Sequence, residues 1–304
     1  MRLVTRSDFD GLACSALLKY LGLVDEWKFV HPKDIQDGLV EVNDQDILVN
    51  VPYTKGCKLW FDHHSSESER LKGVYFEGVA RLAPSCARVV YDYYGGYKKL
   101  GRFEQMLYYV DKVDSGNLTR DEILDPKGWV LLGFIMDPRT GLGRFKDFTI
   151  SNYDLMKMLA QACVDKDIDE ILALPDVQER IARYFEQDKL FRDMIHQYAR
   201  IEDNVVVVDL RNTDPIYAGN RFILYTLFPN QNISLWIVHG KNKANCVITV
   251  GYSILKKDAT VDVGNMLLSY GGGGHRKVGT CQVPYEEADR AITEIVEKCK
   301  TKAS

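Results

Sequence analysis

The first hundred residues alternate short apolar runs with helical patterns. The apolar runs predict strands at residues 1–5, 27–30, 46–51 and 58–61. Between the first two, residues 12–21 repeat apolar side chains at helical spacing and end before Gly22, a frequent helix stop. Further helices are predicted from Pro84 and over residues 100–110. Strands that alternate with helices favour a parallel sheet with helices on its faces, so we predict an α/β fold.

The rest of the chain shows two further patterns. Residues 151–200 are helical in pattern throughout, since Ser151 and Asp154 suit a helix N-terminus and Pro175 opens a long amphipathic stretch. Strands then return at 205–209, 233–238 and 245–250, interleaved with helical patterns at 217–228, 261–270 and 285–299. We predict three parts: a parallel-sheet domain at 1–150, a helical connection at 151–200 and a smaller α/β domain at 201–304.

The composition is that of a folded protein with little net charge. Its 304 residues are 46% hydrophobic and 27% charged, enough to bury one large core or two ordinary ones. The net charge of −4 does not favour long duplex nucleic acid as a partner. The seven cysteines include no CxxC pair and are typical of a reduced protein. Because the sequence shows no signal peptide and no membrane-length apolar run, we expect a cytoplasmic protein that does not contact membranes.

Acidic and imidazole side chains follow two of the predicted strands. Asp8 and Asp10 come just after the first strand, and Asp62-His63-His64 stands at the end of the fourth. Ligands of open α/β sheets bind outside the carboxyl ends of the strands, so neighbouring strands would bring these groups together. Carboxylates with imidazoles favour Mn²⁺, Fe²⁺ or Zn²⁺ over Mg²⁺, and two such ions can clamp a phosphate. The alternative is that Asp8 only caps the following helix and the histidines lie in a surface loop.

A second motif, Tyr270-Gly-Gly-Gly-Gly-His275-Arg276, lies in the predicted smaller domain. A glycine run lets the backbone approach a ligand closely and exposes consecutive N–H groups to an anion. His275 and Arg276 would add side-chain donors, and a guanidinium can bind a phosphate through two hydrogen bonds. A flexible hinge or a helix C-cap is the alternative interpretation.

In this order and spacing, Asp-x-Asp-Gly, Asp-His-His and Gly-Gly-Gly-His resemble the DHH phosphoesterase superfamily with a DHHA1-type second domain. The resemblance covers nearly the whole chain. The superfamily includes RecJ-like nucleases, oligoribonuclease/pAp phosphatases and proteins labelled exopolyphosphatase-related. The resemblance implies a metal cluster in the DHH domain, commonly of Mn²⁺ with Mg²⁺ as the alternative, and a DHHA1 domain that holds the far end of the substrate. It also implies that a homodimer is one option for the assembly.

The resemblance implies a role for each matching residue. The implied metal ligands are Asp8, Asp10, His63 and Asp114, with Asp111, one helical turn earlier, as the alternative to Asp114. His64 would contact the phosphate or support the cluster, while Asp62 would orient the histidines. The implied substrate-binding loop comprises Gly273, Gly274, His275 and Arg276.

Two residues depart from the family pattern. Asn50, a further candidate metal ligand, ends the third strand, where the family has a bridging aspartate, and its neutral amide oxygen would bridge two cations poorly and weaken one metal position. Arg6 stands ahead of Asp8, where the family usually has a further ligand, and its guanidinium could occupy the space of an ion and donate to phosphate. The sequence therefore leaves both one ion and two ions open.

The function expected on these grounds is metal-dependent hydrolysis of a small phosphate ester or anhydride by an activated water. The substrate classes are a short oligonucleotide, a small nucleotide or a short polyphosphate. Asp10, His63 and Asp114 would hold the ion. Charge on the phosphoryl oxygens would be offset by Arg6, His64, His275 and Arg276. A catalytically impaired nucleotide-binding sensor or scaffold is the main alternative. A nucleic-acid-binding module is less favoured, because the chain is acidic.

Overall fold

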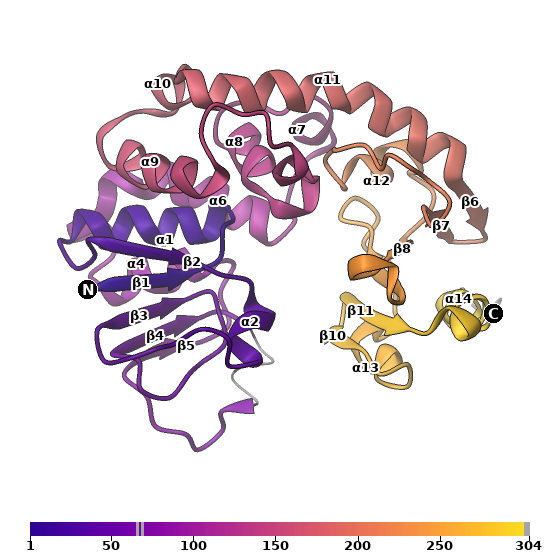
Figure 1. Cartoon of the computed structure of the whole chain (residues 1–304), viewed down its shortest axis with the longest axis horizontal. Coiled ribbons are helices and arrows are strands. Elements are labelled where there is room, and N and C mark those ends of the chain that lie inside the picture. Colours follow the sequence, from indigo (N-terminus) through magenta and orange to yellow (C-terminus); the bar gives the residue numbers. More distant parts are fainter. Residues whose placement is uncertain (65–66, 68–69, 301–304) are drawn as a thin grey trace. The chain divides into compact units, whose positions relative to one another are not determined.

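A computed structural model gives the fold and describes residues 1–64, 67 and 70–300. The chain forms two compact units (Figure 1). The first unit comprises residues 1–117 and 125–185, and the second comprises residues 118–124 and the described chain from Glu186 onward. Both units contain a β-sheet with helices, so the predicted α/β class is confirmed.

The sheet of the first unit has five parallel strands in the order β2-β1-β3-β4-β5. These strands are β1 (Arg2–Thr5), β2 (Glu26–Phe29), β3 (Asp46–Val49), β4 (Leu59–Asp62) and β5 (Gly78–Ala80). β3 and most of β1 and β4 are buried, as expected for parallel strands covered on both faces. The four strands predicted in this half are therefore present, and β5 is an additional edge strand.

Helices cover both faces of this sheet. On one face, α1 (Phe9–Tyr20) packs with α4 (Cys86–Tyr93), α6 (Glu104–Asp114) and α9 (Asn152–Asp165), and the Phe61 ring of β4 lies 5.0 Å from the Tyr93 ring of α4. On the other face, Trp60 of β4 shares a buried cluster with Ile35 of α2 (Pro32–Gln36). The remaining helices of the unit are α5 (Tyr97–Leu100), α8 (Gly128–Met136) and α10 (Ile168–Leu172), and its short 3₁₀ turns are η1 (Gly101–Phe103), η2 (Pro138–Thr140) and η3 (Leu142–Arg144).

The second unit has a mixed six-stranded sheet in the order β10-β11-β9-β8-β7-β6. Its strands are β6 (Ala199–Glu202), β7 (Val205–Asp209), β8 (Ile233–His239), β9 (Cys246–Tyr252), β10 (Gly273–His275) and β11 (Val278–Val283). Its helical elements are α7 (Arg120–Leu124), α12 (Ile223–Leu227), α13 (Val263–Leu268), α14 (Tyr285–Cys299) and the 3₁₀ turn η4 (Lys241–Lys243). The boundary between the units falls within α11 (Pro175–Tyr198), which begins at the predicted Pro175.

The core of the second unit forms where α14 packs on the sheet. Ala288, Ile292 and Ile295 recur at helical spacing, and all three are buried against the strands. Among the described residues, none of the helices combines the length and the hydropathy needed to span a bilayer.

The helix predicted over residues 217–228 is wrong in its first half, because α12 begins only at Ile223. The amide of Ala218 donates to Gln187 Oε1 of α11 at 3.2 Å, and Gly219 lies so close to Phe191 that an added Cβ would meet its ring at 2.3 Å. This segment therefore packs against α11 as irregular chain instead of coiling into a helical turn.

Candidate metal centre

The candidate centre lies at the carboxyl ends of β1, β3 and β4. β1 lies between β2 and β3, so the chain passes from β1 to β2 on one side and from β3 to β4 on the other side. Such a switch point opens a crevice at the sheet edge. Asp8 and Asp10 follow β1, Asn50 follows β3, and Asp62 ends β4 immediately before His63.

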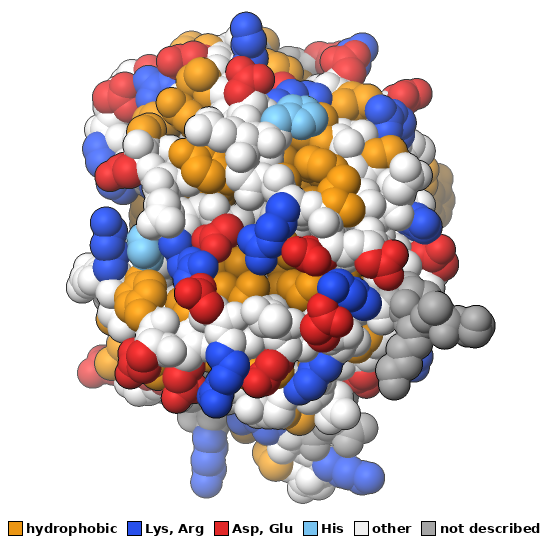
Figure 2. All heavy atoms as spheres, turned by 90° about the vertical axis from the view of Figure 1, so that its right-hand side faces the viewer, with side chains coloured by type: hydrophobic (Ala, Val, Ile, Leu, Met, Phe, Trp, Pro, Cys, Tyr) orange, Lys and Arg blue, Asp and Glu red, His pale blue; other side chains and the backbone are white. Residues whose placement is uncertain are grey.

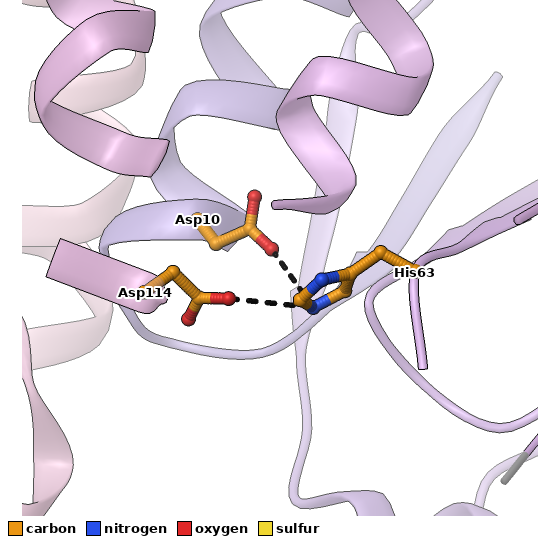
Figure 3. Close-up of side chains that lie close together, drawn as sticks. All are labelled: Asp10, His63 and Asp114. Atoms are coloured by element: carbon orange, nitrogen blue, oxygen red, sulfur yellow. Dashed lines mark ion pairs between the residues drawn. The ribbon is translucent and has the colours of Figure 1, made fainter. Parts of the chain in front are cut away.

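Three of the predicted ligands converge at this edge (Figure 3). His63 Nε2 lies 3.7 Å from Asp10 Oδ2 and 3.4 Å from Asp114 Oδ2. One ligand atom from each residue lies within 4.8 Å of the other two. Asp10 comes from the first turn of α1 and Asp114 from the last residue of α6, so the fold joins positions 104 residues apart in the chain.

The tautomer of His63 is set by the chain itself. His63 Nδ1 lies 3.2 Å from the carbonyl oxygen of Ala83, and a carbonyl can only accept, so Nδ1 carries the proton. In the neutral imidazole this leaves a lone pair on Nε2, directed toward the two carboxylates. A backbone acceptor on the far nitrogen is the usual arrangement for a histidine that binds a metal.

Asp10 is held by the start of α4. Its two oxygens accept hydrogen bonds from the backbone amides of Cys86, at 2.9 Å, and Ala87, at 2.7 Å. Burial, and next the charge of Asp114, nevertheless raise the pKa of Asp10 to about 7. Burial also raises the pKa of Asp114. The cluster therefore concentrates negative charge that a cation would neutralise.

The residues fit a divalent cation. Two carboxylate oxygens and an imidazole lone pair face one another, and all three are acceptors, so they repel unless a proton or a cation lies between them. Mixed carboxylate and imidazole ligands suit Mn²⁺, Fe²⁺ or Zn²⁺. Asp10, His63 and Asp114 are thus the three described residues that would hold such an ion.

Asp8 lies beside this cluster but has other partners. It is the N-cap of α1, where Oδ1 accepts the amide of Gly11 at 2.9 Å. Oδ1 also lies 3.3 Å from Asn50 Nδ2, and Oδ2 lies 3.1 Å from Arg6 Nε. Both oxygens of Asp8 are therefore engaged by donors of the chain.

The backbone of Asn50 adopts a left-handed conformation. Its φ is 55°, in the left-handed region that asparagine tolerates better than most residues. Its side chain is buried, and Oδ1 has no hydrogen-bond partner among the described residues. Nδ2 points its donor at Asp8, so the amide supports Asp8 through hydrogen bonding.

His64 is held by Asp62 through two contacts. Asp62 Oδ1 accepts the His64 backbone amide at 2.6 Å and lies 2.9 Å from His64 Nδ1. Burial lowers the pKa of His64, but the hydrogen bond and the charge of Asp62 outweigh it, so that the pKa lies above its usual value. The His63 and His64 rings lie 4.3 Å apart, which places His64 next to the cluster.

Asp111 has a different set of contacts from Asp114. Ser85 Oγ donates to Asp111 Oδ1 at 2.6 Å, and Arg88 donates to Oδ2 from Nε at 2.9 Å and from Nη2 at 2.8 Å. Asp111 thereby ties α6 to the start of α4, the same turn that holds Asp10. Of the two alternatives, Asp114 is the one in the cluster.

The supporting groups of the centre are not apparent from the sequence. The amides of Cys86 and Ala87 and the carbonyl of Ala83 belong to the backbone, so the identity of these residues does not mark them. Arg139, in η2, is not apparent either, although it lines the same small cavity as Asp10 and Asp114. The helix start after Pro84 was the one available indication, because helix N-termini attract carboxylates.

The glycine motif in the second unit forms the edge strand β10. Gly274, with φ of 149°, pairs with Gly279 of β11, and an added Cβ would lie 2.4 Å from the Gly279 Cα. The amide of Val263, at the start of α13, donates to the Arg276 carbonyl at 2.9 Å. Close backbone packing of α13 and the β10–β11 hairpin therefore accounts for part of the glycine run. Gly273, His275 and Arg276 lie in or directly after β10.

Charges are mixed on the surface of the molecule that Figure 2 shows, where acidic and basic side chains alternate. The net charge of −4 agrees with this pattern. Neither feature resembles the basic stripe of a protein that binds long nucleic acid.

Comparisons with known proteins identify the family. The chain is 46% identical to the pGpG-specific phosphodiesterase PggH from Vibrio cholerae, with 98% of each chain covered and a TM-score of 0.82. RecJ from Thermus thermophilus, solved in complex with Mn²⁺, shares the fold at 13% identity and a TM-score of 0.52, over 98% of this chain and 52% of RecJ. No protein-family model matches the sequence, and no curated protein matches it. Because it is 46% identical to PggH over almost its whole length, the chain belongs to the DHH superfamily and is a phosphohydrolase of the phosphoesterase type.

Proposed function

We propose that the protein is a Mn²⁺-dependent phosphodiesterase that hydrolyses a short linear dinucleotide, with pGpG as the leading substrate. The observation that carries the proposal is the Asp10–His63–Asp114 cluster, which occurs in a chain 46% identical to a pGpG-specific enzyme along almost its whole length. The Mn²⁺ assignment rests on the mixed carboxylate and imidazole ligands, and Mg²⁺ is the alternative ion.

The residues of the centre have distinct tasks in this proposal. A bound cation would lower the pKa of a water near it and offset the charge of a phosphate. Asp10, His63 and Asp114 would hold the cation. His64, kept in place by Asp62, donates a proton or a hydrogen bond to a phosphate oxygen. Arg6, whose Nε is anchored on Asp8, adds positive charge beside the cluster.

We further propose that the centre takes one ion. Arg6 supports this number, because its Nε lies 3.1 Å from Asp8 Oδ2 and offsets the charge of the carboxylate that a second ion would need. The positive charge of Arg6 also opposes a second cation nearby. Elemental analysis should give one Mn²⁺ per chain, and its EPR spectrum should be that of an isolated ion. An exchange-coupled pair of Mn²⁺ ions would contradict the one-ion proposal while leaving the proposed reaction intact.

The second unit has a separate part in the proposal. Residues 201–304 would form a DHHA1 domain, in which Gly273, Gly274, His275 and Arg276 bind another phosphate of the substrate, and residues 1–150 would form the DHH domain. Exposed backbone amides and a guanidinium suit an anion. A cytoplasmic location is part of the same proposal, because the seven cysteines are free and six of them are buried.

The proposal is tested by hydrolysis of a substrate panel with the Mn²⁺-loaded protein. The panel contains pGpG, cyclic di-GMP, pAp, a short oligoribonucleotide and a short polyphosphate. We expect turnover of pGpG that stops with chelator and that is lost in Asp10→Ala and His63→Ala. Asp25→Ala is the matched control, because Asp25 is 82% exposed and pairs with the N-terminal amine at the opposite end of the sheet.

Two outcomes would contradict the proposal. Full activity of His63→Ala would exclude the proposed centre. Thermal stabilisation by pGpG without turnover of any member of the panel would instead favour the nucleotide-binding sensor.

A further inference from the structure

Arg139 lies on the turn that follows α8 and is fixed there by Asp137. Asp137 Oδ1 accepts the backbone amide of Arg139 at 2.8 Å and caps η2. Arg139 Nε donates to both oxygens of the same carboxylate, at 2.7 Å and 3.0 Å. One carboxylate thus sets both the backbone and the direction of the guanidinium.

The outer edge of this guanidinium has no such partner. Neither Nη1 nor Nη2 makes a hydrogen bond to any residue that the structure describes, and the side chain is 47% exposed. An arginine held through Nε keeps its two terminal amino groups free to donate in parallel. That fork is the geometry that binds two oxygens of one phosphate.

Arg139 is also adjacent to the metal ligands. It lines a cavity of about 10 Å³, room for about one water, together with Asp8, Asp10 and Asp114. Burial raises the pKa of Asp114, and the positive charge of Arg139 is among the charges that oppose this shift. Arg139 therefore lies within electrostatic range of a ligand of the candidate ion.

We propose that Arg139 is a substrate-binding residue that donates from Nη1 and Nη2 to non-bridging oxygens of the phosphate under attack. The inference rests on the proposed phosphodiester hydrolysis and adds a contact to it. It makes Asp137 a positioning residue, because Asp137 would act on the substrate through Arg139. Arg6 and Arg139 are then two guanidiniums beside the same ligands, and both are anchored through Nε to an aspartate.

A purely structural role makes a different set of predictions. If Arg139 only stabilised its turn or neutralised Asp114, its loss would change the unfolding temperature or the Mn²⁺ affinity but not the affinity for phosphate. Substrate binding predicts the reverse. The two roles are therefore separated by measuring Mn²⁺ and phosphate binding in the same variants.

The experiment compares Arg139→Gln and Arg139→Lys with the wild type and with Arg102→Gln as the matched control. Arg102 is an exposed arginine of the same unit, and its guanidinium lies over Tyr20 and Phe103. Inhibition by inorganic phosphate and kcat/KM for pGpG are measured on the Mn²⁺-loaded proteins, and calorimetry gives their Mn²⁺ affinity. We expect Arg139→Gln to lower kcat/KM about 100-fold and to weaken phosphate inhibition at least about 10-fold, with Mn²⁺ affinity unchanged. Arg139→Lys should recover only part of both losses, because a lysine cannot donate as a fork.

Unchanged phosphate inhibition in Arg139→Gln, or an equal effect of Arg102→Gln, would overturn the assignment. Failure of the proposed function has another signature, because the wild type would then not hydrolyse pGpG. In that case phosphate binding by calorimetry still tests Arg139, since it requires no turnover.

Discussion

Asp62 and His64 are joined twice, because one carboxylate oxygen of Asp62 takes both the backbone amide and the Nδ1 of His64. The double contact fixes the peptide after β4 and the plane of the imidazole together. It also favours the imidazolium form, since Asp62 is buried and its charge is close. His64 therefore keeps its ring proton to a higher pH than an isolated histidine.

Asp62→Asn should lower kcat/KM for pGpG by about 10- to 100-fold, the usual cost of losing a residue that supports a metal centre. The carboxylate raises the pKa of His64, so its removal lowers that pKa, and the basic limb of the pH–rate profile should move to lower pH. The profile of kcat/KM against pH measures this shift. An unchanged basic limb would mean that His64 does not act in its protonated form.

Asp111→Asn and Asp114→Asn should affect different properties, although both residues lie near the end of α6. The first should lower stability and the second should weaken metal binding. Asp111→Asn removes the charge that pairs with Arg88, so we expect a loss of about 1–3 kcal/mol in the free energy of unfolding with Mn²⁺ binding retained. Asp114→Asn should weaken Mn²⁺ binding by more than about 100-fold, because it removes a ligand and not a supporting residue. Urea unfolding and calorimetric titration with Mn²⁺ separate the two. Lost Mn²⁺ binding in Asp111→Asn alone would reverse the assignment.

The metal-free protein should lose stability as the pH rises. In the folded chain the pKa of Asp10 is raised to about 7 from its ordinary 3.8, so between these values the folded state binds more protons than the unfolded state. Stability linked to Asp10 therefore falls from about pH 4 and reaches its minimum above about pH 7. With chelator, we expect a lower Tm at pH 8 than at pH 5.5, and Mn²⁺ should raise Tm more at pH 8.

Asp10→Asn is the control for this pH effect, because it keeps the shape of the side chain and removes the charge. In the variant, the chelated Tm should depend much less on pH, and Mn²⁺ should no longer raise it. If the wild type and Asp10→Asn lose stability equally between the two pH values, Asp10 is not the origin of the effect.

The sequence was sufficient to predict elements with a repeating apolar pattern and site residues that directly follow a strand. The parallel strands were predicted from their apolar runs, and Asp10 and His63 were placed together because both follow strands of one sheet. Asp114 was favoured over Asp111 only through a family resemblance, since the two lie one turn apart on α6. The direction in which each one points depends on how α6 packs against α4.

The contacts that the sequence did not reveal arise from tertiary structure. In the sequence Arg139 has no feature that distinguishes it from other loop residues. The fold places it beside the acidic cluster, because the turn that follows α8 lies there. The absence of the predicted helix before Ile223 has a similar origin. Contacts with Gln187 and Phe191 of α11 hold that segment as irregular chain, and they outweigh its local helix propensity. Local pattern describes the elements, while packing between elements decides which side chains meet.

The glycine motif offers a test of packing that does not depend on activity. An added Cβ at Gly274 would lie 2.4 Å from both the Gly279 Cα and the Val278 carbonyl oxygen, and φ is 149°. Gly274→Ala should therefore lower the free energy of unfolding by more than about 2 kcal/mol. Gly271→Ala is the matched control: φ is 69° and nothing lies within 4 Å of the new Cβ, so only the backbone cost of about 1 kcal/mol applies. Urea unfolding of both variants measures the difference. Equal losses would show that β10 and β11 separate easily, and the glycines would then be better explained by ligand binding than by packing.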